Sequence, residues 1–246
     1  MKQISLKPGE AIEDLLRGSL KIIQKKSGYR FSIDAVLLAN FAGIKKGAGV
    51  VDLGTGSGVI PLILNFRHDS INVTGIELDP ESADMARRSV ELNNLSEKIS
   101  IVDGDLRGIK KLFKPESFAS ALANPPYGKP GTGRINPNGQ IASARHEISG
   151  NLDDFLGAAS YLLKYRGRLS IIYPARRVAD VIVGMRRLNV EPKRMQMVHS
   201  REGEGASLVL VEGVKGGGVE MEVMKPLYIY APDGSYSGEI EDMYRY

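Results

Sequence analysis

A short apolar run that ends in three closely spaced glycines constrains the fold most. Val50-Val51-Asp52-Leu53 has the composition of a buried strand, and Gly54, Gly56 and Gly58 follow it directly. Glycine at alternate positions lets a backbone come close to a ligand where any Cβ would collide. Because a helix-like segment starts at residue 59, the pattern predicts a strand that enters a helix through a tight glycine turn, as in βαβ units.

The same alternation of short strands and helices continues along the chain. Helical spacing of apolar residues follows Ser32, Pro80 and Asn151, and recurs from Val178. Strand-like runs lie between them, and the last two follow each other without a helix, which predicts an antiparallel hairpin at the sheet edge. The expected strands cover residues 49–53, 71–77, 99–103, 118–123, 169–173, 195–200 and 207–214. We expect an α/β, Rossmann-like fold: a seven-stranded, mostly parallel sheet with an antiparallel C-terminal hairpin and helices on both faces.

Length and composition narrow the classes of protein. The 246 residues fit a single domain over 1–246, in which residues 1–30 form an N-terminal extension that caps the core. With no cysteine there are no disulfides or thiolate metal sites, which is compatible with a cytoplasmic protein. The three histidines lack metal-ligand spacing, and we expect no metal, signal peptide or membrane segment. A net charge of +4 suits a polyanionic partner such as RNA.

Acidic residues after two further strands indicate which cofactor the glycine turn holds. Glu77 ends the next expected strand, where a carboxylate can accept hydrogen bonds from ribose hydroxyls, and Asp105 follows the strand after it. Dinucleotide sites usually have G-x-G-x-x-G, whereas this loop is G-x-G-x-G preceded by Asp52. An anion there would repel a pyrophosphate and suit the cationic end of S-adenosylmethionine. The pattern favours S-adenosylmethionine over a dinucleotide, with an ordinary glycine turn as the remaining alternative.

The sequence Asn124-Pro125-Pro126-Tyr127 is the sharpest catalytic signal. It follows an expected strand, and two prolines stiffen the turn and fix the direction of the Pro125 carbonyl. The Asn124 side-chain oxygen and that carbonyl can accept hydrogen bonds from the two N–H groups of a planar exocyclic amine. These two hydrogen bonds favour a pyramidal nitrogen whose lone pair points at a methyl group. Tyr127 offers a face for base stacking. The alternative is a rigid turn with a packed tyrosine.

These motifs resemble those of class I methyltransferases, which carry a D-x-G-x-G-x-G loop, an acid that ends the second strand, and [N/D]-P-P-[Y/F] after the fourth. Within that class the chain is similar to bacterial tRNA adenine-N6 methyltransferases of the valine-tRNA type. This closer likeness rests on residues 30–38, 144–148 and 226–230.

The resemblance implies methylation of the adenine just 3′ of the anticodon in a valine tRNA. It also implies that Phe31, Ser32 and Asp34 help to hold the methionine end of S-adenosylmethionine. We therefore expect the cofactor to contact these residues and those of the motifs: Phe31, Ser32, Asp34, Asp52, Gly54, Thr55, Gly56, Gly58, Glu77, Leu78, Asp105, Leu106 and Asn124.

The segment after the catalytic motif is the expected contact with tRNA or another structured RNA. Residues 128–150 are rich in glycine and proline and contain Lys129, Arg134, Arg145 and His146. Basic side chains give affinity for phosphates without base specificity, and an anticodon loop already exposes its bases. Together with Tyr127 these four residues are our expected substrate contacts. The alternative is a flexible surface loop.

Three other functions remain open at this point. A protein-glutamine methyltransferase of release factors also acts on a planar nitrogen, but such enzymes usually have a longer N-terminal helical domain than the stretch before Arg30. A guanine-N2 ribosomal RNA methyltransferase generally prefers Phe at the position of Tyr127. An RNA-binding scaffold on this fold would not need the intact cofactor residues Asp52 and Glu77.

Overall fold

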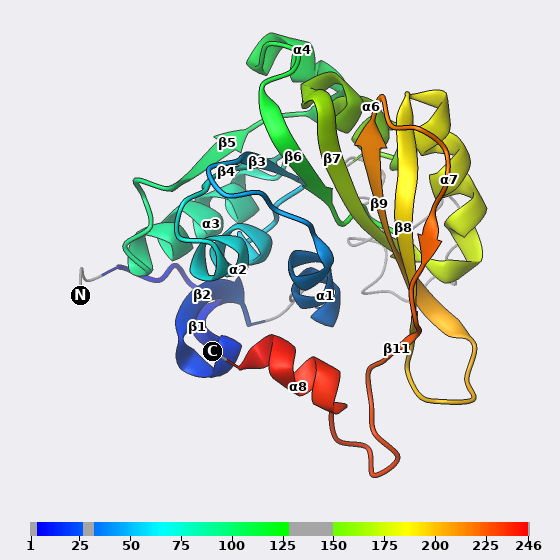
Figure 1. Ribbon diagram of the computed structural model, residues 1–246. Helices are drawn as coiled ribbons and strands as arrows, with labels where there is room; N and C mark the ends of the chain where they lie inside the picture. Colours follow the sequence, from blue (N-terminus) through cyan, green and yellow to red (C-terminus); the bar gives the residue numbers. More distant parts are fainter. Residues whose placement is uncertain (1–3, 27–31, 128–149, 246) are drawn as a thin grey trace, which may run out of the picture.

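The computed structural model describes residues 4–26, 32–127 and 150–245, and in it one wide sheet carries helices on both faces (Figure 1). The strand order is β5-β4-β3-β6-β7-β9-β8, and two short strands, β10 and β11, both pair with β8. All neighbours are parallel except β9, which is antiparallel to β7 and β8. The sheet strands are β3 (Gly49–Leu53), β4 (Asn72–Glu77), β5 (Ile99–Asp103), β6 (Phe118–Ala123), β7 (Leu163–Pro174), β8 (Val190–His199), β9 (Ala206–Lys215), β10 (Glu222–Val223) and β11 (Leu227–Tyr228).

The predicted fold class is confirmed, and the seven expected strands form the main part of the sheet. The predicted bounds of β3, β5 and β6 agree with the structure, whereas β7 and β8 begin earlier than the apolar runs indicated. Helices form where Ser32, Pro80, Asn151 and Val178 predicted them. The α-helices are α1 (Ile33–Phe41), α2 (Val59–Arg67), α3 (Pro80–Leu92), α4 (Ile109–Leu112), α6 (Leu152–Leu162), α7 (Val178–Arg187) and α8 (Gly238–Tyr244).

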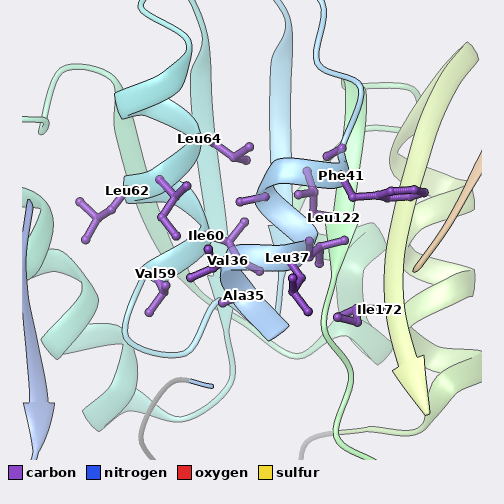
Figure 2. Packing of buried hydrophobic residues seen from close by; sticks show 14 of the residues in the cluster. Ala35, Val36, Leu37, Phe41, Val59, Ile60, Leu62, Leu64, Leu122 and Ile172 are labelled. Carbon is purple, nitrogen blue, oxygen red and sulfur yellow. The ribbon is translucent and has the colours of Figure 1, made fainter. Parts of the chain in front are cut away.

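Two hydrophobic clusters cover the two faces of the sheet. Successive residues of a strand point to opposite faces, so Val50 joins one cluster and Val51 the other, and Ile172 and Ile171 divide in the same way. The first cluster contains the buried faces of α1 and α2, seen in Figure 2 packed around Leu122 of β6. The second contains those of α6 and α7. Burial on both faces explains why these strands are continuous apolar runs.

An N-terminal hairpin packs against α3. The strands β1 (Glu10–Leu15) and β2 (Leu20–Lys25) are antiparallel, and the Ile23 N–H donates to Ser89 Oγ at 2.9 Å. Arg88 of α3 donates to both carboxylate oxygens of Glu10, at 2.6 and 2.7 Å. The sequence predicts only an N-terminal extension over residues 1–30 in this region, with no strands in it. The first strand was missed because its pattern is inverted: Glu10 is buried and Ile12 is 43% exposed.

The C-terminal part adds a second element that the sequence analysis missed. Helix α8 lies beside α1 and the N-terminal hairpin (Figure 1), and its Ile240 is fully buried in the first cluster. The Ser237 hydroxyl caps this helix by accepting from the Ile240 N–H at 3.4 Å, and donates to the Tyr228 carbonyl at 2.6 Å. Helix α8 therefore packs against α1 and extends the first hydrophobic cluster.

A buried carboxylate ties the end of α1 to the antiparallel part of the sheet. Glu212 of β9 is fully buried, and it accepts from Arg168 at 2.6 Å, from Arg194 at 3.1 Å and from the Gly43 backbone N–H at 2.8 Å. Burial alone would raise the pKa of Glu212, but the Gly43 hydrogen bond and the two arginine charges together lower it. The network therefore stabilises the ionised form and fixes the position of α1.

Replacing this carboxylate should destabilise the fold. We expect Glu212→Gln to lower the free energy of unfolding by about 2–4 kcal/mol, because two arginines lose their shared anion. Glu191→Gln is the matched control, since the Arg186 partner of Glu191 is 58% exposed and such pairs contribute less than about 1 kcal/mol. Urea denaturation of both variants measures the difference, and equal losses would contradict the proposed role of Glu212.

Candidate active site

The glycine loop joins β3 to α2 and is tied to the end of β4. Gly54, Gly56 and Gly58 have φ angles of +70°, +57° and +89°, a backbone region that favours glycine. A Cβ on Gly54 would lie 3.0 Å from Phe155, and one on Gly58 would lie 3.2 Å from the Ala86 Cβ. The turn therefore favours glycine at all three positions, and close packing adds to this requirement at Gly54 and Gly58. Gly54 is exposed between buried neighbours, so its backbone is open to a ligand.

Two carboxylates with different hydrogen bonding lie beside this loop. Asp52, two residues before Gly54, is fully buried, and no described group meets hydrogen-bond geometry to either of its oxygens. Burial raises the pKa of Asp52 to about 7, with a contribution from the negative charge of Glu77, and the nearby Thr55 hydroxyl offsets this only in part. Glu77 accepts from the backbone N–H groups of Gly56 at 2.7 Å and Asp79 at 2.9 Å, which only partly offset the burial that raises its own pKa.

Other buried oxygens near the glycine loop also lack partners within the described part of the chain. They are the Thr55 hydroxyl in the loop, the Ser32 hydroxyl at the start of α1, and Gln24 Oε1 on β2. The Gln24 amide nitrogen donates to the Ser57 hydroxyl of the loop at 3.2 Å. Sequence analysis missed Gln24 and Ser57, because the link joins the N-terminal hairpin to a loop more than 30 residues away. An apolar strand that carries one buried glutamine was the available signal.

The Asn-Pro-Pro-Tyr motif lies next to the glycine loop. Strands β3 and β6 are parallel neighbours, and Leu53 pairs with Ala123, so Gly54 and Asn124 begin at the same level of the sheet edge. Pro125 is buried, while Asn124 and Tyr127 are partly exposed. The two motifs, which are 70 residues apart in sequence, are therefore brought together at the carboxyl edge, where ligands bind in open α/β sheets.

Tyr127 connects this motif to α1. Its hydroxyl lies 2.5 Å from Asp34 Oδ2 in the first turn of α1 and 2.9 Å from Asn124 Oδ1. Its ring packs edge-on with the buried Tyr173, with centroids 5.8 Å apart at 87°. The Tyr173 hydroxyl in turn accepts from Arg177 at 2.7 Å. Tyr127 is thus held both through its hydroxyl and through its ring.

The remaining predicted residues are distributed as follows. Asp105 caps the short helix at Leu106–Gly108, and its carboxylate accepts from Arg107 Nη2 at 2.6 Å, which lowers the pKa of Asp105. Leu106 is buried next to it, and Leu78 lies beside Glu77, partly exposed. Contact of these three with a cofactor stays a prediction. Five expected site residues lie outside the described ranges: Phe31, Lys129, Arg134, Arg145 and His146.

Two kinds of site are not found in the parts of the chain that the structure describes. No three His, Asp or Glu side chains within residues 4–26, 32–127 and 150–245 are grouped so that they could hold a metal ion. Among the helices of these same ranges, none is both long and apolar enough for a membrane span.

The unpartnered oxygens define the chemistry of a ligand. Buried acceptors at Asp52 and Thr55 call for a ligand that supplies donors and positive charge. The ammonium and sulfonium of S-adenosylmethionine meet both demands, whereas the pyrophosphate of a dinucleotide would meet the charges of Asp52 and Glu77. The residues present therefore fit S-adenosylmethionine, and Glu77 would be the residue to accept hydrogen bonds from its ribose hydroxyls.

Comparison with solved structures agrees with the fold. A predicted O-methyltransferase from Agrobacterium tumefaciens superimposes with a TM-score of 0.68 at 23% identity, covering 86% of this chain and 97% of that one. A SAM dependent methyltransferase from Aquifex aeolicus superimposes with a TM-score of 0.54 at 16% identity, covering 74% and 89%. The fold is therefore that of the S-adenosylmethionine-dependent methyltransferases.

Comparison of sequences is more specific. The family model described as methyltransferase small domain matches residues 32–176, and the chain belongs to this family. A Porphyromonas gingivalis protein named tRNA1(Val) (adenine(37)-N6)-methyltransferase is 34% identical over 65% of this chain, and the chain spans 64% of that relative's length. A protein of the same name from Shewanella halifaxensis is 28% identical over 86% of this chain and 89% of its own length.

The buried Asp52 leads to a prediction that separates stability from binding. Because its pKa is higher in the folded than in the unfolded chain, it favours folding below about pH 4, and this contribution is lost as the pH rises through 7. We expect Asp52→Asn without ligand to be more stable than the parent at pH 8, by on the order of 3 kcal/mol, with a difference that shrinks towards pH 4.

The same variant should bind S-adenosylmethionine at least about tenfold more weakly at pH 8, because residue 52 would no longer supply a negative charge to the cationic end of the cofactor. Denaturant titration and calorimetry at several pH values measure the two effects. Asp69→Asn, at an exposed position, is the control and should change neither. A loss of stability in Asp52→Asn at pH 8 would show that the carboxylate is compensated within the free protein.

Proposed function

We propose that this protein is an S-adenosylmethionine-dependent methyltransferase that acts in the cytoplasm on the N6 amino group of adenine in tRNA. The target we infer is the adenine just 3′ of the anticodon in a valine tRNA. The observation that carries the proposal is the pairing of Leu53 with Ala123, which starts the glycine loop and Asn124 side by side. A cofactor on the loop and an amine on Asn124 would then face each other.

The residues of the motif account for the chemistry at the amine. The lone pair of an exocyclic amine is delocalised into the ring, so the nitrogen is a weak nucleophile. The Asn124 side-chain oxygen and the Pro125 carbonyl would accept hydrogen bonds from the two N–H groups of the amine. This would direct the nitrogen lone pair out of the plane of the base. S-adenosylmethionine supplies the methyl group. The methylated nitrogen is acidic and loses one proton to solvent, so no base with a special pKa is needed.

The identity of the acceptor draws its support from the relatives. Proteins named tRNA1(Val) (adenine(37)-N6)-methyltransferase match this chain from several bacterial genera, including Porphyromonas and Bacteroides. The basic residues Lys129, Arg134, Arg145 and His146, and stacking on Tyr127, remain our proposed contacts with the RNA.

Protein-glutamine methylation is the second candidate, because an amide nitrogen is planar in the same way. The described N-terminal segment is a two-stranded hairpin and not a helical domain, which favours RNA. A guanine-N2 methyltransferase is the third candidate and a non-catalytic RNA-binding scaffold the fourth. The unpartnered Asp52 argues against the scaffold, because a buried charge of this kind is costly without a ligand.

Removing the amide of Asn124 should abolish transfer. We expect Asn124→Ala to lower kcat by roughly 100-fold or more, because one of two acceptors for the amine is lost, with S-adenosylmethionine affinity changed less than about threefold. Asn72→Ala, at an exposed position at the start of β4, is the matched control and should keep full activity. Full activity in Asn124→Ala would remove the proposed role of Asn124.

The acceptor itself can be identified in one assay. Unmodified total tRNA, ribosomal RNA and release factors are each incubated with the protein and methyl-labelled cofactor, and products are mapped by mass spectrometry. N6-methyladenosine in valine tRNA is the expected product. Methylglutamine or N2-methylguanosine would select one of the two rival acceptors, and absence of cofactor binding in calorimetry would select the scaffold.

A further inference from the structure

We propose that Asp34 is a positioning residue, which acts through the Tyr127 hydroxyl to set the orientation of the Asn124 side-chain amide. The inference rests on the proposed function, since it concerns the acceptor that Asn124 offers to the substrate amine. It assigns Asp34 to the substrate side of the site, whereas the family resemblance implied contact with the methionine end of the cofactor.

The Tyr127 hydroxyl has one hydrogen and two oxygens within reach. The Tyr127 hydroxyl lies within hydrogen-bond distance of Asp34 Oδ2, at 2.5 Å, and of Asn124 Oδ1, at 2.9 Å. A phenol has one hydrogen and cannot donate to two oxygens at once, and an ionised carboxylate is an acceptor only. One of the three groups must therefore turn.

The carboxylate takes the hydrogen, for two reasons. Its contact with the hydroxyl is the shorter one, and a hydrogen bond to an ionised acceptor is roughly twice as strong as one to a neutral amide. Asp34 also lies in the first turn of α1, where the helix N-terminus stabilises a negative charge. The hydroxyl oxygen of Tyr127 is then left as an acceptor on the side of Asn124.

That remaining acceptor selects one orientation of the amide. The oxygen and nitrogen of an Asn side chain exchange places by a half turn, and hydrogen bonds decide between the two arrangements. Against an acceptor, the NH2 group of Asn124 faces Tyr127, and its oxygen faces away from the phenol. The amide oxygen is then free to accept an N–H of the substrate amine, as the proposed chemistry requires.

Neighbouring residues hold the hydrogen-bonded side chains of Asp34, Tyr127 and Asn124 in place. The ring of Tyr127 packs against Tyr173, which is 1% exposed and fixed by the hydrogen bond from Arg177. Asp34 itself is 8% exposed on a helix whose neighbours are buried. Because both ends are anchored, the direction of the Tyr127 hydrogen depends on the chemistry of residue 34 more than on side-chain motion.

Changing Asp34 to Asn should reverse the direction of the hydrogen bonds between residues 34, 127 and 124. An amide at residue 34 can donate to the Tyr127 oxygen, which directs the phenol hydrogen to Asn124 and engages the amide oxygen that the substrate needs. We expect Asp34→Asn to lower kcat by roughly 10- to 100-fold, with S-adenosylmethionine affinity and the KM for tRNA each changed less than about threefold. Asp153→Asn, in the first turn of α6 and exposed, is the control and should keep full activity.

Tyr127→Phe distinguishes positioning from a structural role. Without the hydroxyl the Asn124 amide can take either orientation, so this variant should lose only a few-fold in kcat, and phenylalanine keeps the ring. Adding Tyr127→Phe to Asp34→Asn should therefore restore activity to the level of Tyr127→Phe alone. Independent effects that multiply, or weaker cofactor binding in Asp34→Asn with kcat unchanged, would overturn the proposal.

A spectroscopic measurement separates this inference from the proposed function. The short hydrogen bond between Tyr127 and Asp34 should give a low-field proton resonance that is absent in both single variants and present in Asp153→Asn. If this resonance is missing from the parent protein, the inference fails whatever the acceptor. If it is present but the labelled methyl group goes to glutamine, the proposed function fails, and the same comparison of kcat on that acceptor decides the role of Asp34.

Discussion

The parallel pairing of β3 with β6 is the constraint on which the site depends. Residues on neighbouring parallel strands that pair with each other stay at the same height, so whatever follows Leu53 must start beside whatever follows Ala123. The turn after the first strand leaves Gly54 exposed, and the turn after the second leaves Asn124 partly exposed beside the buried Pro125. Strand register therefore places the two turns of the proposed site side by side.

Two fully buried carboxylates of the sheet differ in their hydrogen bonding. Glu212 is a buried carboxylate with every oxygen engaged, and it serves packing between α1 and the strands. Asp52 is equally buried, but neither of its oxygens is engaged by an arginine or a backbone N–H among the described residues, so its ionised form is costly in the free protein. Uncompensated polar groups of this kind mark functional sites, because selection for stability alone would remove them.

The sequence was most informative where local and long-range requirements coincide. The strands at residues 49–53, 99–103 and 118–123 could be bounded from sequence, because each is an apolar run that ends in a glycine, an acid or a proline. The N-terminal strand could not, since Ile12 faces outward and Glu10 inward against Arg88. Helix α8 is short and carries one deeply buried residue, too little for a periodic pattern to appear.

The site was predictable by motif and not by contact. Asp52, Gly54 and Asn124 could be singled out because the proposed chemistry needs those residue types in a fixed local order, and the structure places the two motifs side by side. The link between Asp34 and Tyr127 spans 93 residues, and the link between Gln24 and Ser57 spans 33. Pairs of this kind are set by how separate elements dock, and a single sequence without periodicity between the partners contains no signal for them.

The sheet separates the hydrophobic clusters on its two faces, and the glycine loop contacts both of them. On one side the loop continues into α2, which belongs to the first cluster, and on the other side Gly54 lies against Phe155 of the second. Substitutions buried in different clusters should thus act independently on stability over most of the molecule. Near Phe155 this independence ends, because repacking of side chains beneath α6 would shift the backbone of the glycine loop, from which α2 begins. Substitutions in the two clusters should therefore have non-additive effects on stability near this loop.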